Sequence, residues 1–133
     1  MAEHPHADDP TIADNSALWR RILPEWAVHD ENRGSLRVSS AAFDNSKDGT
    51  PTSVHLAQVA SELGRGPADI LRRYASYGLA ALTAGEARAC GQLVGRDPLP
   101  DDPTHGYIAG PKPRSVKKRL AAAAVWVITP PHR

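Results

Sequence analysis

Residues 52–64 read TSVHLAQVASELG, and this stretch carries the clearest structural signal in the chain. Its apolar side chains stand at i, i+3, i+4 and i+7, the spacing of one face of an α-helix: Leu56, Val59, Ala60 and Leu63. Gly64 follows in the position after a helix end, where glycine adopts the left-handed conformation without strain. The pattern predicts a helix over 56–63, and residues 53–55 before it read as the end of a strand.

The next segments continue this alternation of helix and strand. Pro67 suits the first turn of a second helix, which we expect to carry Ile70, Leu71 and Tyr74 and to stop near Gly78. Residues 77–82 form a compact apolar run, typical of a buried strand.

A capping box follows this strand. Thr83 and Glu86 have the spacing in which the hydroxyl accepts from the Glu86 amide while the carboxylate reaches back. We expect the helix that they open to carry Ala87, Cys90 and Val94 on one face and to end at Gly95.

The last third of the chain begins with a loop. Residues 96–104 hold three prolines and three aspartates, and residues 106–110 fit a short strand. Ser115 is expected to cap a helix that turns Val116, Leu120 and Ala124 inward. Residues 125–128 either continue that helix or form a final strand.

Upstream of the opening stretch the pattern is weaker. Residues 1–13 read as a disordered or loosely attached acidic arm, and residues 18–23 fit either a short helix or a strand. Residues 30–35 read as a loop, 36–43 as a short strand and 44–51 as a turn. We therefore predict a single α+β domain over 14–133, built of short strands with three or four short helices.

Composition narrows the class of protein. The chain has 133 residues and a net charge of +1, and its longest apolar run, Leu120–Ile128, is about half of what spans a bilayer. Met1–Pro10 is acidic and lacks an apolar core, so we expect no secretory signal. Cys90 is the one cysteine, which excludes an internal disulfide and favours a reducing cytoplasm. We read it as a small buried residue.

Neither the spacing of the histidines nor the distribution of charge along the chain predicts a strong binding site. The six histidines show no ligand spacing, so we expect no metal cofactor: they stand at positions 4, 6, 29, 55, 105 and 132. Residues 1–31 hold seven acids and two arginines, whereas residues 103–133 hold six bases and no acid. These ends either attract each other or meet an outside partner, and the bases at 112–119 could grip nucleic-acid phosphates.

One set of polar residues has a composition that suits a dinucleotide. An arginine on an early strand, Arg20 or Arg21, can clamp a diphosphate, and the hydroxyls of Ser39 and Ser40 can bond a ribose. Glu62 on the following helix can stabilise positive charge at a glycosidic carbon. If residues 18–23 form a strand, Arg21 shares the face of Trp19, which favours Arg21 over Arg20.

The order of these residues resembles the RES-domain family of NAD-consuming bacterial toxins, which have the ADP-ribosyltransferase-like fold. The resemblance covers residues 19–62 and 102–105. It implies NAD as substrate, with Glu62 catalytic and the arginines and serines binding. It also implies binding roles for His55, which stands where the family has tyrosine, and for His105 in the late Asp-Pro-Thr-His motif.

Three functions therefore compete. The leading hypothesis is an NAD-processing toxin or defence domain of the ADP-ribosyltransferase-like class. The first alternative is a non-catalytic interaction or immunity-type module that binds a protein through the charged ends. The second is a nucleic-acid backbone binder that uses the C-terminal basic helix over 112–119. Release of nicotinamide from NAD by the purified protein would favour the first.

Overall fold

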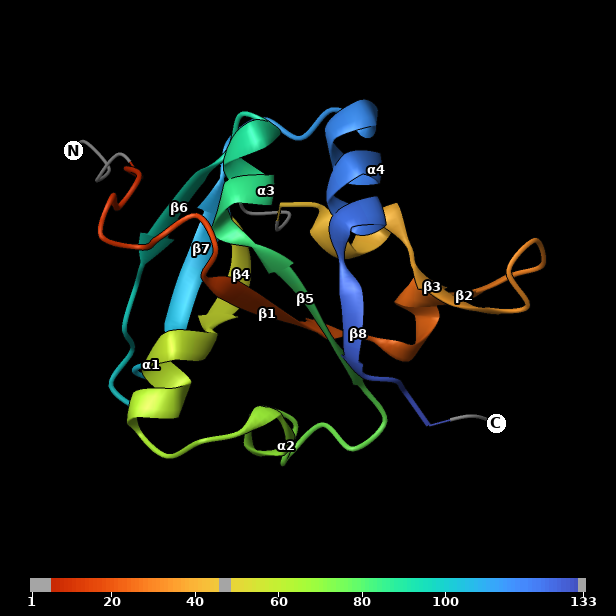
Figure 1. Cartoon of the computed structure of the whole chain (residues 1–133), viewed down its shortest axis with the longest axis horizontal. Helices are drawn as coiled ribbons and strands as arrows, with labels where there is room; N and C mark the ends of the chain where they lie inside the picture. Colours follow the sequence, from red (N-terminus) through yellow and green to blue (C-terminus); the bar gives the residue numbers. More distant parts are fainter. Residues whose placement is uncertain (1–5, 46–48, 132–133) are drawn as a thin grey trace.

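The computed structural model describes residues 6–45 and 49–131, and in these residues eight strands and four α-helices form a small α+β domain (Figure 1). This confirms the predicted fold class. The elements, with two 3-10 helices labelled η, are β1 Ala17–Ile22, η1 Pro24–Trp26, β2 Ala27–Asp30, β3 Ser35–Val38, η2 Ser40–Phe43, β4 Thr52–Leu56, α1 Ala57–Glu62, α2 Pro67–Ile70, β5 Gly78–Thr83, α3 Ala84–Ala89, β6 Leu93–Arg96, β7 His105–Ala109, α4 Arg114–Ala123 and β8 Val125–Ile128.

Six of the described strands form one antiparallel sheet in the order β6-β7-β4-β1-β5-β8, while β2 and β3 form a separate hairpin. The stretch 18–23, for which helix and strand stayed open, belongs to the central strand β1. Because side chains alternate along a strand, Leu18 and Ile22 lie on one face of the sheet and Trp19 and Arg21 on the other.

The main hydrophobic core covers the first face. Leu18 and Ile22 are fully buried there together with Phe43 of η2 and Leu120 of α4. Figure 1 shows α3 and α4 side by side on this part of the molecule. Burial of these large apolar side chains stabilises the fold.

The second face carries a smaller cluster. Ile70, Leu71 and Leu79 are buried, and Trp19, Tyr77 and Ile128 pack against them. The short helix α2 therefore holds to the sheet through few side chains. A groove lined by polar residues remains beside this small cluster.

The described part of the predicted acidic arm lies alongside β6 and α3. Asp8 accepts hydrogen bonds from Arg88 Nε at 2.9 Å and from the Val94 amide at 3.0 Å, and Ile12 is buried. The bond from Arg88 is the main cause that lowers the pKa of Asp8. Asp14 and Asp9 pair with Arg88 and Arg96 at 2.7 and 3.1 Å. These three acids thus pair with α3 and β6 instead of the basic C-terminal end; residues 1–5 lie outside the described range.

The predicted helix-end and capping signals are confirmed where the two interacting residues are close in sequence. Gly64 has a φ of +72° after α1, as expected for the residue behind a helix end. The Glu86 amide donates to Thr83 Oγ1 at 3.1 Å, and the Thr83 amide donates to Glu86 Oε1 at 2.8 Å. The predicted buried strand is β5, and residues 125–128 form strand β8.

Four predicted element boundaries are wrong. The strand predicted over 36–43 ends at Val38, because Ser39 Oγ accepts from the Ala41 amide and begins η2. The second helix ends at Ile70, and Ser115 lies inside α4, whose N-cap is Pro113. The third helix ends at Ala89; Gly91, with φ of +80°, turns the chain so that Val94 belongs to β6.

Within the described residues, no helix has the length and apolar character needed to cross a membrane.

Candidate functional site

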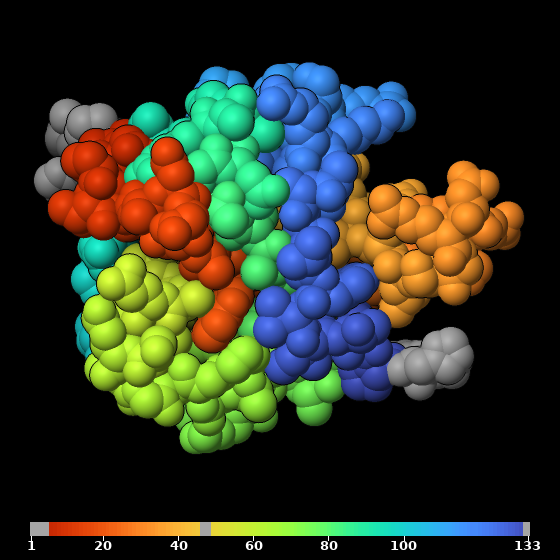
Figure 2. All heavy atoms as spheres, viewed as in Figure 1, coloured from red at the N-terminus to blue at the C-terminus, as the bar shows by residue number. Residues whose placement is uncertain are grey.

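Two grooves hold most of the polar side chains that the sequence singled out. The first, of about 810 Å³, lies between the β2–β3 hairpin and α4 and is called here the hairpin–α4 groove. Its charged side chains come from two distant parts of the sequence: Arg33 and Arg37 on the hairpin, Arg114 and Lys118 on α4, and Asp30. Figure 2 shows the hairpin projecting from the body of the molecule beside α4.

The bases of this groove are poorly compensated. Arg33 Nε lies 3.8 Å from Asp30, the one acid among the described lining residues. Arg37, Arg114 and Lys118 are exposed and have no hydrogen-bond or ion-pair partner among the described residues. Trp126 Nε1 donates to the Leu36 carbonyl at 3.1 Å, and this bond joins β8 to the hairpin.

The other bases of the segment 112–119 bond within the molecule. Lys112 Nζ donates to Asn45 Oδ1 at 2.6 Å and to the Ile108 carbonyl at 2.9 Å, and burial lowers the pKa of Lys112 to about 8. Lys117 pairs with Asp44 at 2.8 Å, and Arg119 donates to the Ala89 carbonyl at 3.4 Å. Only part of the predicted basic patch is therefore available to an outside anion.

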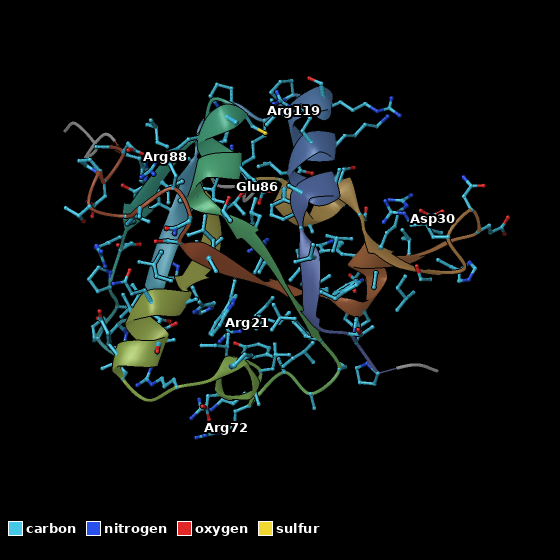
Figure 3. All side chains as sticks on the ribbon, in the orientation of Figure 1. Arg21, Asp30, Arg72, Glu86, Arg88 and Arg119 are labelled. Carbon is cyan, nitrogen blue, oxygen red and sulfur yellow. The ribbon has the colours of Figure 1, made fainter. Side chains whose placement is uncertain are left out.

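The second groove, of about 760 Å³, lies on the second sheet face beside α2 and is called here the α1–α2 groove. Arg21 reaches it from β1, and Figure 3 shows this side chain between β1 and α2. Arg21 Nε donates to the Ile70 carbonyl at 2.9 Å, and its guanidinium lies 4.2 Å from the centre of the Tyr74 ring. These contacts fix the plane of the guanidinium against the groove wall.

A short hydrogen-bonded chain lies behind Arg21. Thr104 Oγ1 donates to Asp102 Oδ1 at 2.6 Å, and His55 Nδ1 lies 2.9 Å from Thr104 Oγ1 and 3.2 Å from Asp102 Oδ2. Since the threonine proton is used, His55 Nδ1 must donate, and its Nε2 keeps the lone pair. Burial, with the nearby Arg21 charge, lowers the pKa of His55 to about 4, so this ring is neutral at pH 7.

His105 lines the same groove on the neighbouring strand. Its Nδ1 lies 3.0 Å from the Asp97 carbonyl, and its Nε2 lies 3.1 Å from Ser53 Oγ. The rim carries Arg65, Arg72 and Arg73. Asp69 holds Arg72 at 2.5 Å, whereas Arg65 and Arg73 are exposed and have no hydrogen-bond or ion-pair partner among the described residues.

The residues predicted for one dinucleotide site are distributed over the molecule. Arg21, His55 and His105 line the α1–α2 groove, whereas Ser39 and Ser40 line the hairpin–α4 groove. The structure brings the first three together because β1, β4 and β7 are neighbours in the sheet.

Arg20 and Glu62 line neither groove. Arg20 lies on the first face, where it donates to the Ala42 and Ser53 carbonyls at 2.9 and 2.8 Å, and burial lowers its pKa to about 10. Glu62 is exposed on α1 and accepts from Gln58 at 3.4 Å. Within the described residues, no group of three His, Cys, Asp or Glu side chains could hold a metal ion.

The sequence prediction named Arg21 and the bases at 112–119 but missed the other basic residues of both grooves. Arg33 stands in the turn of the hairpin and Arg37 on β3, and Gly34 was the available turn signal. Arg65, Arg72 and Arg73 surround α2, and their recurrence over nine residues was the other signal. The convergence of Arg37 with Arg114 has no local signal, because it depends on packing of the hairpin beside α4.

The helices α1 and α2 follow one another with a short connection. Residues 63–66 join them, and Gly64 supplies the left-handed conformation in this turn. Two consecutive short helices, of six and four residues, are thus joined by a turn that contains glycine.

Comparison with protein families gives a match that covers more than half of the chain. A family described as wHTH-Hsp90_Na associated, in which wHTH denotes winged helix-turn-helix, matches residues 4–79. This range contains β1, the hairpin, β4, α1 and α2. None of the curated proteins and none of the solved structures matches the chain.

This match overturns the resemblance to the RES-domain family. A winged helix-turn-helix family is not an ADP-ribosyltransferase-like family, so the hypothesis of an NAD-consuming toxin is wrong. The misleading signals were common residue types in a plausible order: Arg20 bonds carbonyls inside the fold and Glu62 faces solvent. Of the three hypotheses, nucleic-acid binding accords better with this family.

Proposed function

Because the chain belongs to the wHTH-Hsp90_Na associated family, we propose that it binds nucleic acid through the phosphate backbone, in the hairpin–α4 groove. This proposal extends the hypothesis of nucleic-acid binding by a C-terminal basic helix. The helix forms one wall of the groove, and the hairpin forms the other wall with Arg33 and Arg37. The observation that carries the proposal is the convergence of four bases and one acid on this groove.

Charge compensation supports this choice of surface. A polyanion gains most from bases that have no internal partner, because each contact releases a counterion without breaking an ion pair. Arg37, Arg114 and Lys118 meet this condition among the described residues. Lys117 does not, since it already pairs with Asp44.

Shape supports it as well. The hairpin is a two-stranded ribbon that stands away from the sheet, and a ribbon of this kind fits the major groove of duplex DNA (Figure 2). Ser39 and Ser40 lie at its base, where Ser40 can add a hydroxyl contact to a phosphate oxygen.

The aspartates of the α1–α2 groove argue against making it the main surface. Asp69, Asp101 and Asp102 line it together with its arginines. A polyanion laid along this groove would meet these carboxylates, whereas the hairpin–α4 groove presents only Asp30.

A location in the cytoplasm, expected from the single cysteine, belongs to the same proposal.

The test is a titration of a fluorescein-labelled 15-base-pair duplex by fluorescence anisotropy at low salt. Arg37, Arg114 and Lys118 are replaced together by glutamine, and we expect the affinity to fall by at least about tenfold. The control is Arg119→Gln, which removes one charge from α4 outside the groove and should leave the affinity close to wild type. An unchanged affinity in the triple variant would refute the assignment.

A further inference from the structure

The α1–α2 groove contains a cation whose hydrogen-bonding capacity is only partly used. Arg21 donates through Nε to the Ile70 carbonyl. Its two terminal nitrogens have no acceptor among the described residues, and no carboxylate there pairs with it. A half-buried guanidinium held by Tyr74 presents its free N–H groups in a fixed plane, which suits bidentate contact with a planar or tetrahedral oxyanion.

Hydrogen-bonding groups of both kinds surround this guanidinium. The rim arginines supply N–H groups, while Asp101 and Asp102 supply carboxylate oxygens. His55 also lines the groove, and its Nε2 is an acceptor because Nδ1 donates toward Thr104 and Asp102. A ligand that fits this set must carry both an anionic group and hydroxyl groups.

The carboxylates that line this groove disfavour a long polyanion. The groove has a volume of about 760 Å³, within the range of roughly 300–1,000 Å³ that is usual for small-molecule sites. Three aspartates among its lining residues would repel successive phosphates of a nucleic acid. A small ligand can instead place one phosphate at Arg21 and its hydroxyls at the carboxylates.

We infer that the α1–α2 groove binds a small phosphomonoester, whose phosphate pairs with Arg21 and whose hydroxyl-bearing part contacts Asp101, Asp102 and His55. The site lies on the sheet face opposite to the face on which α4 packs. It is therefore independent of the nucleic-acid surface, and its occupancy requires no nucleic acid.

The test is a titration of the ¹⁵N-labelled full chain, followed by amide chemical shifts, with glucose 6-phosphate, inorganic phosphate and glucose as three separate probes. We expect saturable shifts at residues 21, 53, 55 and 105 with glucose 6-phosphate. Inorganic phosphate should bind at the same residues about tenfold more weakly, and glucose should produce no shifts. If inorganic phosphate binds as well as glucose 6-phosphate, or if shifts lie outside the groove, the inference is wrong.

Arg21→Lys adds a second readout. Lysine keeps the charge but loses the two parallel N–H groups, so affinity for glucose 6-phosphate should fall about tenfold. Arg119→Gln, outside both grooves, should bind as the wild type does. If Arg21→Lys does not fold, the shift map of the wild-type chain decides alone. Equal affinity in a folded Arg21→Lys would overturn the role of Arg21, whatever the duplex titration gives.

Discussion

The two grooves differ in how their arginines are compensated. In the hairpin–α4 groove, Arg37 and Arg114 have no partner among the described residues and Asp30 is the one acid. In the α1–α2 groove, arginines stand beside three aspartates and two histidines. The difference teaches that counting basic residues is a poor guide to a nucleic-acid surface. The acids that line the same groove must be counted too, since Arg21, Arg65 and Arg73 of the α1–α2 groove also have no ion-pair partner among the described residues.

The grooves also rest on cores of different size. Phe43 and Leu120 belong to the large cluster under the hairpin–α4 side, while α2 is attached through Ile70 and Leu71 in a cluster of three buried residues. We therefore expect the α1–α2 groove to be the more deformable of the two. Local opening follows the parts of a fold with few buried contacts.

The largest expected effect tests this difference in support. Phe43→Ala should lower the free energy of unfolding by about 3–5 kcal/mol, because the ring is fully buried in the large cluster. Ile70→Ala should cost about 2 kcal/mol, since the one-turn helix α2 can relax around the lost side chain. Urea denaturation measures both. An Ile70 variant as costly as the Phe43 variant would show that the two grooves are equally well supported.

The second prediction concerns pH and the α1–α2 groove alone. His55 takes up its proton at about pH 4 in the folded state and near 6.5 when unfolded, so the unfolded chain binds more protons between these values. Stability must then fall as pH falls from 6.5 to 4, by about 2–3 kcal/mol at roughly 1.4 kcal/mol per pKa unit. The groups that act on this ring are Arg21, Asp102, His105 and Arg20.

The measurement is urea denaturation at several pH values in this window. His55→Gln should flatten the profile by about the same 2–3 kcal/mol, whereas His29→Gln, which changes an exposed histidine on β2, should leave it as in the wild type. Parallel profiles for the wild type and His55→Gln would contradict a buried neutral His55.

The smallest expected effects on stability distinguish the N-terminal ends of α3 and α4, the two helices that cover the first face. Thr83→Ala should cost about 1 kcal/mol, because it removes the hydroxyl that caps α3. Ser115→Ala should change stability by less than about 0.5 kcal/mol, since Ser115 lies inside α4 and caps nothing. Equal losses in thermal denaturation would mean that Ser115 caps α4 after all.

What the sequence could predict follows from the distance between interacting groups. The capping box at Thr83 and the glycine behind α1 were predicted because each signal lies within one turn of chain. The end of β3 at Val38 was missed because the Ser39 hydroxyl competes with the strand ladder, and strand propensity does not register this bond.

The candidate site residues show the same difference between local signals, which the sequence reveals, and contacts between distant segments, which it does not. Arg21, His55 and His105 meet because three strands distant in sequence are neighbours in the sheet. Nothing in the sequence separates Ser39 and Ser40 from them, yet the serines lie in the other groove. The charge-bearing residue types could be read from the sequence, but their grouping depends on strand order and on the packing of the hairpin beside α4.

The most direct test of the central claim is the salt dependence of duplex binding for Lys118→Gln and Arg119→Gln. These neighbours on α4 carry the same charge, but only Lys118 lines the hairpin–α4 groove. Each phosphate contact adds about 0.9 to the slope of log affinity against log salt concentration. We predict that Lys118→Gln lowers the slope by about 0.9 and that Arg119→Gln leaves it at the wild-type value. Equal slopes in the two variants would contradict phosphate binding in this groove.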